Sequence, residues 1–180
     1  KKKKKKKNKK YRKKIKKTFS LQPKKKKKNK VLKDYCKKLK KYEKLIINQN
    51  KKDIYNAKKN GLKKNLIDRL LLNHEKILKL IGSIQTIIKL KDPTNKLLDR
   101  WKQSNGLDIS KVSTPIGIIC VIYESRPNVT SDVASLCFKS GNVVILRGGS
   151  EAFYSNKILS KLFRDSLKKN NIDENFVQFI

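Results

Sequence analysis

The chain has 180 residues, and its 49 lysines and arginines against 14 aspartates and glutamates give a formal net charge of +35. Residues 1–64 hold 32 of the basic and only three of the acidic side chains, so the remaining 116 residues carry only +6. The sequence has no run of about 18 apolar residues and no apolar segment behind its first lysines, so we expect neither a membrane-spanning helix nor a secretory signal, and we expect a cytosolic protein.

The first residues form a lysine-rich, low-complexity stretch. Residues 1–30 have too few apolar side chains to pack strongly, so we expect a tail there. From Val31 to Ile46, apolar residues recur at helical spacing and lysines occupy the opposite side, which predicts an amphipathic helix with a basic outer face. A lysine at position 1, the lack of methionine and an apolar end at residues 176–180 indicate a fragment.

Further helices and a hairpin are predicted before residue 112. Gly61 is expected to interrupt the helical stretch, and apolar stripes over residues 62–71 and 77–88 predict two more helices, the second ended by Pro93. The Asn-Gly pair at 105–106 favours a type I′ hairpin turn, because both residues tolerate positive φ. Trp101 is expected to pack beside this hairpin. Residues 31–111 are therefore predicted to be a helical region with a β-hairpin.

The cysteine and histidine pattern points to no disulfide framework and no metal site. Cys36, Cys120 and Cys137 are widely separated, and His74 is the only histidine. We expect reduced, mostly buried thiols and a solvated histidine at a helix start.

The last third of the chain has the pattern of a parallel α/β unit. Residues 116–123 and 142–146 are short apolar runs, typical of strands that are covered on both faces. Helix-start chemistry at Pro127, a glycine stop at Gly141 and an apolar stripe up to Leu167 predict a helix after each strand. Residues 112–180 are therefore predicted to be the start of an α/β domain with a right-handed parallel connection.

The loop after the second predicted strand is the stronger candidate for a binding site. Ligands of open parallel sheets gather at the carboxyl ends of the strands. Gly148 and Gly149 would let a ligand approach the backbone, Arg147 would face a phosphate or ribose, and Ser150 and Glu151 begin a helix whose amides favour anions. A tight turn with a solvated arginine is the competing interpretation.

The loop after the first predicted strand offers one catalytic candidate. Asn128 could donate its side-chain amide to a developing oxyanion. An asparagine at the start of a helix is more commonly an N-cap, and this alternative stays open at the level of sequence.

Two long motifs in this region resemble those of gamma-glutamyl phosphate reductases, also called glutamate-5-semialdehyde dehydrogenases. They are YESRPNVT at residues 123–130 and LCFKSGNVVILRGGSEA at residues 136–152. Upstream, DRLLL at 68–72, Asp92-Pro93 and the sequence NGL at 105–107 are also similar to that family, so the resemblance covers residues 31–180.

The resemblance implies a fold, a reaction and roles for the loop residues. The fold would be aldehyde dehydrogenase-like, with N-terminal helices and a hairpin followed by an incomplete Rossmann-like parallel sheet. NADPH would reduce L-glutamyl 5-phosphate to glutamate 5-semialdehyde, with release of phosphate, in proline synthesis from glutamate. Asn128 would stabilise the oxyanion, and the NADP(H) site would take seven residues of the two loops: Ser125, Arg126, Arg147, Gly148, Gly149, Ser150 and Glu151.

The resemblance also implies that part of the active site is absent from this chain. The catalytic cysteine of the family lies beyond position 180, and we expect Cys120 and Cys137 to be buried, inert thiols. The hairpin resembles the arm through which this superfamily oligomerises, which implies a homo-oligomer for the intact protein.

A binding function is the alternative interpretation of the charge. A lysine-rich arm could hold a nucleic acid or an anionic surface, and polyanion adhesion that fades with salt is expected in any case. However, residues 1–64 contain 31 lysines and only one arginine, Arg12, although arginine makes most bidentate contacts to phosphates and bases. We therefore expect no specific nucleic-acid or membrane partner.

Overall fold

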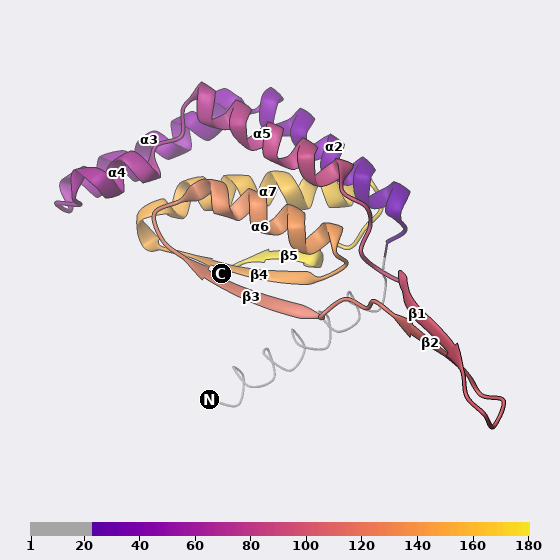
Figure 1. The fold of residues 1–180 in the computed structure, drawn as a ribbon. Helices are drawn as coiled ribbons and strands as arrows, with labels where there is room; N and C mark the ends of the chain where they lie inside the picture. The colour runs from indigo at the N-terminus through magenta and orange to yellow at the C-terminus, as the bar shows by residue number, and fades with distance from the viewer. Residues whose placement is uncertain (1–22) are drawn as a thin grey trace, which may run out of the picture.

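The computed structural model describes residues 23–180, so most of the expected lysine-rich tail lies outside the described residues. The first half of the chain is helical and the second half alternates strands with helices (Figure 1). The helices are α2 (Lys25–Lys41), α3 (Glu43–Lys59), α4 (Lys64–Leu70), α5 (His74–Lys89), α6 (Pro127–Lys139) and α7 (Phe153–Lys169). The strands are β1 (Leu97–Lys102), β2 (Asp108–Val112), β3 (Ile118–Tyr123), β4 (Val143–Gly148) and β5 (Val177–Phe179), and 3-10 turns cover Ser150–Ala152 (η1) and Glu174–Phe176 (η2).

The body of the molecule is a three-stranded parallel sheet under two layers of helices (Figure 1). The strand order is β3-β4-β5, with Ile118 of β3 opposite Val143 and Tyr123 opposite Gly148. Helices α6 and α7 lie directly on the sheet, and the helices from the first half of the chain lie over them. The predicted strand-helix-strand-helix unit and its parallel pairing are therefore confirmed.

One cluster of buried side chains extends through both helical layers and the sheet. Tyr35 of α2 packs against Phe163 of α7 with the rings tilted and their centroids 4.7 Å apart, and Phe138 of α6 lies edge-on to Phe163 at 5.8 Å. The hydroxyl groups of Tyr35 and Ser131 share a buried hydrogen bond of 2.6 Å. The early helices are thus packed into the same core as the α/β unit.

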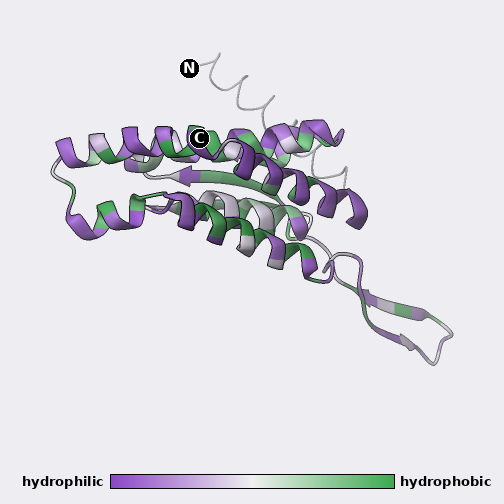
Figure 2. Ribbon diagram, turned by 90° about the horizontal axis from the view of Figure 1, so that it is seen from above, coloured by the Kyte–Doolittle hydropathy of each residue, from purple (hydrophilic) through white to green (hydrophobic). Residues whose placement is uncertain are grey.

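Helix α2 has the predicted amphipathic pattern but begins and ends differently from the prediction. It starts at Lys25, six residues before the expected start, because Lys28 is buried and its Nζ lies 3.1 Å from an oxygen of Asp92. It ends at Lys41, and Tyr42 separates it from α3 and is exposed. The lysines of the outer side are exposed as expected, and the ribbon in Figure 2 marks hydrophilic residues of the helices in purple.

The hairpin β1–β2 is confirmed, but its turn differs from the predicted one. Gly106 has a φ of +87°, whereas Asn105 is not among the residues with positive φ, so a type I′ turn is wrong. The amide of Gly106 donates to the carbonyl of Gln103, and the amide of Gln103 donates to the carbonyl of Leu107. This pattern is a turn closed by a left-handed glycine bulge, the usual geometry of a three-residue hairpin loop. The hairpin projects from the body and Trp101 is 41% exposed, so its expected packing is not found within the described residues (Figures 1 and 2).

Strand β3 is open on one face, contrary to the expectation of two covered faces. Ile118 and Ile122 are exposed, and so is Cys120 between them. Among residues 23–180, helices pack on only one face of the sheet, and β3 is an edge strand (Figure 1). Within residues 23–180, the apolar residues of β3 are therefore covered on one face of the sheet only.

No helix within the described part of the chain is long and apolar enough to cross a membrane.

Candidate functional site

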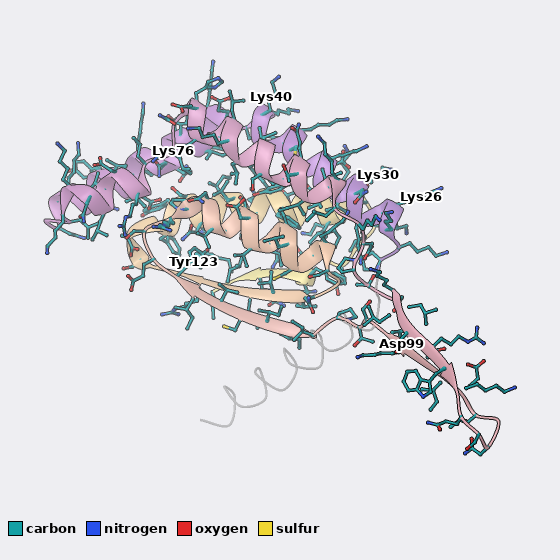
Figure 3. All side chains as sticks on the ribbon, in the orientation of Figure 1. Lys26, Lys30, Lys40, Lys76, Asp99 and Tyr123 are labelled. Carbon is teal, nitrogen blue, oxygen red and sulfur yellow. The ribbon has the colours of Figure 1, made fainter. Side chains whose placement is uncertain are left out.

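The loops after β3 and β4 leave the sheet at the same edge. Tyr123 and Gly148 are partners in the parallel register, and the amide of Gly149 donates to the carbonyl of Tyr123 at 2.9 Å. Figure 3 labels Tyr123 at this end of the sheet, below the start of α6. This edge is where ligands of parallel sheets bind, and the seven predicted cofactor residues and Asn128 all lie in or next to the two loops.

Glu151 connects the two loops. Its Oε1 accepts hydrogen bonds from the amide of Ser125 at 2.5 Å and from the Ser125 hydroxyl at 3.0 Å. Ser125 is buried and has a φ of +44°, a left-handed conformation that costs a non-glycine residue about 1–3 kcal/mol. The carboxylate therefore stabilises a strained turn at the edge of the site. Sequence reasoning placed both residues in the site but missed this contact, because they are 26 residues apart.

The two glycines after β4 make room for side chains of the protein itself. A Cβ at Gly148 would lie 2.1 Å from Nδ2 of Asn156, and a Cβ at Gly149 would lie 2.2 Å from the carboxylate oxygens of Glu151. Both distances are far below a van der Waals contact, so any larger residue would displace these side chains. The glycines keep the loop close to α7 and to Glu151.

Two arginines are available for an anionic ligand at this edge. Arg126 and Arg147 are exposed, and among the described residues neither guanidinium has a hydrogen-bond or ion-pair partner. Ser150 is also exposed and begins η1. Guanidinium groups match phosphates and sugar hydroxyls, so this donor set fits the diphosphate and ribose of a dinucleotide.

Asn128 is not the N-cap of α6. Arg126 takes the N-cap position without a side-chain cap, Pro127 is the first helical residue and Asn128 is the second. The Asn128 amide donates to Oδ2 of Asp132, one turn along the helix, at 3.3 Å. The capping alternative is thus wrong, and the side chain contacts its own helix instead.

Asn128 and Asp132 line a cavity of about 360 Å³ between α5 and α6. Leu71, Leu72 and Leu80 give the cavity an apolar wall. Its other polar residues are Arg69, Lys76, Lys79 and Ser83. Sequence reasoning missed this cavity, because the packing of α5 on α6 brings together residues that are far apart in the sequence.

The three cysteines divide into two kinds. Burial raises the pKa of the Cys36 and Cys137 thiols to about 11, which favours the protonated form at neutral pH, and the predicted burial of Cys137 is confirmed. Cys120 is exposed on the open face of β3, so its predicted burial is wrong. All three are free, and residues 23–180 contain no group of three or more His, Cys, Asp or Glu side chains that could hold a metal ion.

His74 has a structural partner on the surface. It is the first residue of α5, its Nδ1 lies 2.6 Å from Oε1 of Glu43, and its side chain is 67% exposed. It lies outside the two loops, and the prediction of a solvated group at a helix start is confirmed.

Comparison with known proteins finds close sequence relatives, although no family model matches the chain. Gamma-glutamyl phosphate reductase from Petrotoga mobilis is 47% identical over 135 residues, which is 75% of this chain and 32% of the relative. The enzyme of the same name from Nautilia profundicola is 49% identical over 136 residues, 76% of this chain and 33% of the relative. The chain thus spans about a third of the length of the curated relatives it matches.

Solved structures give the same relationship. The crystal structure of gamma-glutamyl phosphate reductase from Thermotoga maritima superposes with a TM-score of 0.90 at 41% identity, over 93% of this chain and 41% of that one. A glyceraldehyde-3-phosphate dehydrogenase from Methanocaldococcus jannaschii, solved with NADP, shares the fold with a TM-score of 0.58 at 18% identity, over 93% of this chain and 34% of that one. The chain is therefore homologous to one part of gamma-glutamyl phosphate reductase and has the aldehyde dehydrogenase fold.

Proposed function

We propose that the intact protein reduces L-glutamyl 5-phosphate to L-glutamate 5-semialdehyde with NADPH and releases phosphate, a step of proline synthesis from glutamate. The observation that carries this proposal is the 41% identity and TM-score of 0.90 to a gamma-glutamyl phosphate reductase over 93% of the chain. The reaction needs a cofactor site, an oxyanion donor and a nucleophile, and the chain offers candidates for the first two.

The cofactor site is proposed at the edge formed by the loops after β3 and β4. When bound there, the nicotinamide supplies the hydride. Arg126 and Arg147 would bind its phosphates or ribose, because their guanidinium groups are exposed and unpaired within residues 23–180. Ser125, Gly148, Gly149 and Glu151 would fix the shape of the edge, and the exposed Ser150 would offer a hydroxyl group.

Asn128 is the proposed oxyanion donor. A thiolate that attacks the acyl phosphate places negative charge on the carbonyl oxygen, and an amide N–H aimed at that oxygen stabilises the transition state. The side chain of Asn128 lines the cavity beside the proposed cofactor site, and its amide already donates to Asp132. An amide nitrogen has two N–H donors, so one can donate to the substrate while the other keeps the contact with Asp132.

The nucleophilic thiol is proposed to come from a part of the protein outside this chain. Cys36 and Cys137 are buried, and the raised pKa of each opposes thiolate formation. Cys120 is exposed on β3, but within the described residues no lysine, arginine or histidine is paired with it. The chain would thus hold one side of the active site.

The hairpin is the proposed contact between subunits of a homo-oligomer. It projects from the body, and its exposed apolar residues are Leu97, Leu98, Trp101, Leu107 and Val112. Burying such a surface against a second copy of the chain would stabilise the assembly.

Replacing Arg147 by alanine in the intact protein tests the cofactor site. We expect NADPH to bind about tenfold more weakly, the lower end of the effect of losing a hydrogen bond to a charged group, while KM for the acyl phosphate changes little. Fluorescence titration of NADPH measures the first effect and steady-state kinetics the second. Lys44→Ala is the control for loss of a positive charge, since Lys44 is exposed on α3 and lies outside both loops and the hairpin. Unchanged NADPH affinity in the Arg147 variant would remove this residue from the site.

A further inference from the structure

The cavity beside Asn128 carries charge of both signs. Arg69, Lys76 and Lys79 contribute three positive charges to its lining and Asp132 one negative charge. Figure 3 labels Lys76 in the upper helical layer, above the end of the sheet that carries Tyr123. Through Asn128 the cavity adjoins the loop after β3, and its other lining residues lie outside the two loops.

The positive side of the cavity has an unused donor. Lys79 is paired with Glu75 at 2.7 Å, and the Nζ of Lys76 donates to the carbonyl of Asp68 at 2.7 Å. The guanidinium of Arg69, by contrast, has no hydrogen-bond or ion-pair partner in the part of the chain that the structure describes. An arginine with five free donors favours a planar, bidentate anion such as a carboxylate.

The negative side of the cavity is the carboxylate of Asp132, which two neighbouring side chains hold in place. Asp132 accepts one hydrogen bond on each oxygen, from the Ser83 hydroxyl at 3.0 Å and from the Asn128 amide at 3.3 Å. A carboxylate has about four acceptor positions, so two remain for a ligand. These two hydrogen bonds hold the carboxylate of Asp132, which is half-buried, and leave its negative charge in place. The carboxylate can therefore bind a cationic group of a ligand.

The spacing matches an amino-acid substrate whose reacting carbon lies at the far end of its side chain. The amide nitrogen of Asn128 and Oδ2 of Asp132 lie 3.3 Å apart, so two ligand groups that approach from the cavity, one to each atom, can be a few ångströms further from each other. In a glutamyl group, three carbon–carbon bonds separate the acyl carbon from the α-carbon, a span of roughly 4 Å. A carbonyl at Asn128 would thus bring the α-ammonium group to Asp132 and the α-carboxylate to the basic side of the cavity.

We infer that this cavity binds the α-amino-acid end of the substrate, with Arg69 on the α-carboxylate, assisted by Lys76, and Asp132 on the α-ammonium group. This inference rests on the proposed function and deepens it, because it assigns substrate specificity to residues of α4, α5 and α6. Arg69 and Asp132 determine substrate specificity, whereas bonds form and break at the acyl carbon, whose oxygen faces Asn128.

Arg69→Gln and Asp132→Asn in the intact protein test the two contacts separately. Each should raise KM for L-glutamyl 5-phosphate between roughly 10- and 100-fold, the range for hydrogen bonds to charged groups, with kcat and the Kd of NADPH nearly unchanged. Lys44→Gln removes an exposed charge from α3 and is the control for long-range electrostatics. Arg69→Lys keeps the charge and should recover part of the loss.

Competitive inhibitors distinguish the contact with the α-carboxylate from the contact with the α-ammonium group. L-glutamate carries both α groups, and glutarate lacks the ammonium group. Asp132→Asn should raise the Ki of L-glutamate and leave that of glutarate unchanged, whereas Arg69→Gln should raise both. Unchanged KM in both variants, with an active wild type, would show that this cavity does not bind the α-amino-acid end of the substrate. The proposed reaction would still stand. A wild-type protein that does not reduce L-glutamyl 5-phosphate would overturn the proposed function, and this inference with it.

Discussion

Lys28→Met is expected to lower the free energy of unfolding by about 3–5 kcal/mol, the cost of removing one partner of a buried ion pair. The side chain of Lys28 is only 1% exposed, its Nζ lies 3.1 Å from Oδ2 of Asp92, and it also donates to the hydroxyl of Thr94 at 3.2 Å. Without the ammonium group, Asp92 keeps its burial and loses its cation. Urea denaturation of wild type and variant, with constant m-values, measures the difference.

The double variant Lys28→Met/Asp92→Leu is the control for this prediction. Replacing both partners by apolar residues removes the unpaired charge, so much of the lost stability should return. If Lys28→Met alone costs less than about 1 kcal/mol, the value typical of surface pairs, the pair is not effectively buried.

Asp92 also gives the pair a defined pH dependence. Burial by itself raises the pKa of Asp92, but hydrogen bonds from Thr94 and Lys28 and the charge of Lys28 outweigh it and lower the pKa below the ordinary 3.8. The ionised group therefore contributes stability above pH 3.8 that is lost as the pH falls through the lowered pKa. Asp92→Asn should make the acid limb of a stability-against-pH curve shallower.

Asn128→Ala in the intact protein is expected to reduce kcat by roughly 10²- to 10³-fold, the loss measured for removal of an oxyanion donor. KM for the acyl phosphate should change little, since the contact strengthens only as negative charge develops on the carbonyl oxygen. Steady-state kinetics with L-glutamyl 5-phosphate and NADPH measure both constants.

Asn56→Ala provides the matched control, because Asn56 is an exposed asparagine within helix α3 and its side chain has no partner among the described residues. Asn128 is not an N-cap, so its replacement should also leave the unfolding free energy nearly unchanged. A kcat close to wild type would exclude Asn128 as the oxyanion donor.

Much of the fold follows from local pattern. The apolar runs at 116–123 and 142–146, with a helix after each, were enough to predict the parallel unit, because such runs have few other stable arrangements. Boundaries that depend on distant partners were less predictable. Helix α2 begins early because Lys28 pairs with Asp92, 64 residues away, and no local signal identifies a lysine that will be buried.

The predictions for Cys120 and for the turn at Asn105 were wrong because they used local sequence alone, whereas the surrounding fold decides both. Cys120 was predicted to be buried because the apolar run of β3 is typical of a strand with two covered faces, whereas residues 23–180 provide cover for only one. The turn at Asn105 was predicted from a dipeptide preference, and the flanking register selected a three-residue loop with a bulge at Gly106 instead.

The part of the proposed site that lies in the loops after β3 and β4 could be predicted from the sequence. The part that depends on helix packing could not. Loop chemistry and the family resemblance predicted Asn128, Arg147 and Glu151 as site residues, and all three lie in or next to the loops after β3 and β4. The contact between Glu151 and Ser125, and the cavity that joins Arg69 to Asp132, arise from residues brought together by the fold. Sequence spacing contains no signal for either.

We propose that this chain provides the oxyanion donor and part of the cofactor site, while the nucleophile comes from another part of the protein. The most direct test is a single assay of NADPH oxidation with L-glutamyl 5-phosphate, run on the chain of residues 1–180 and on the intact protein at equal concentrations. We expect turnover by the intact protein and none by the chain alone. Measurable turnover by the chain alone, abolished by Cys120→Ser, would contradict it.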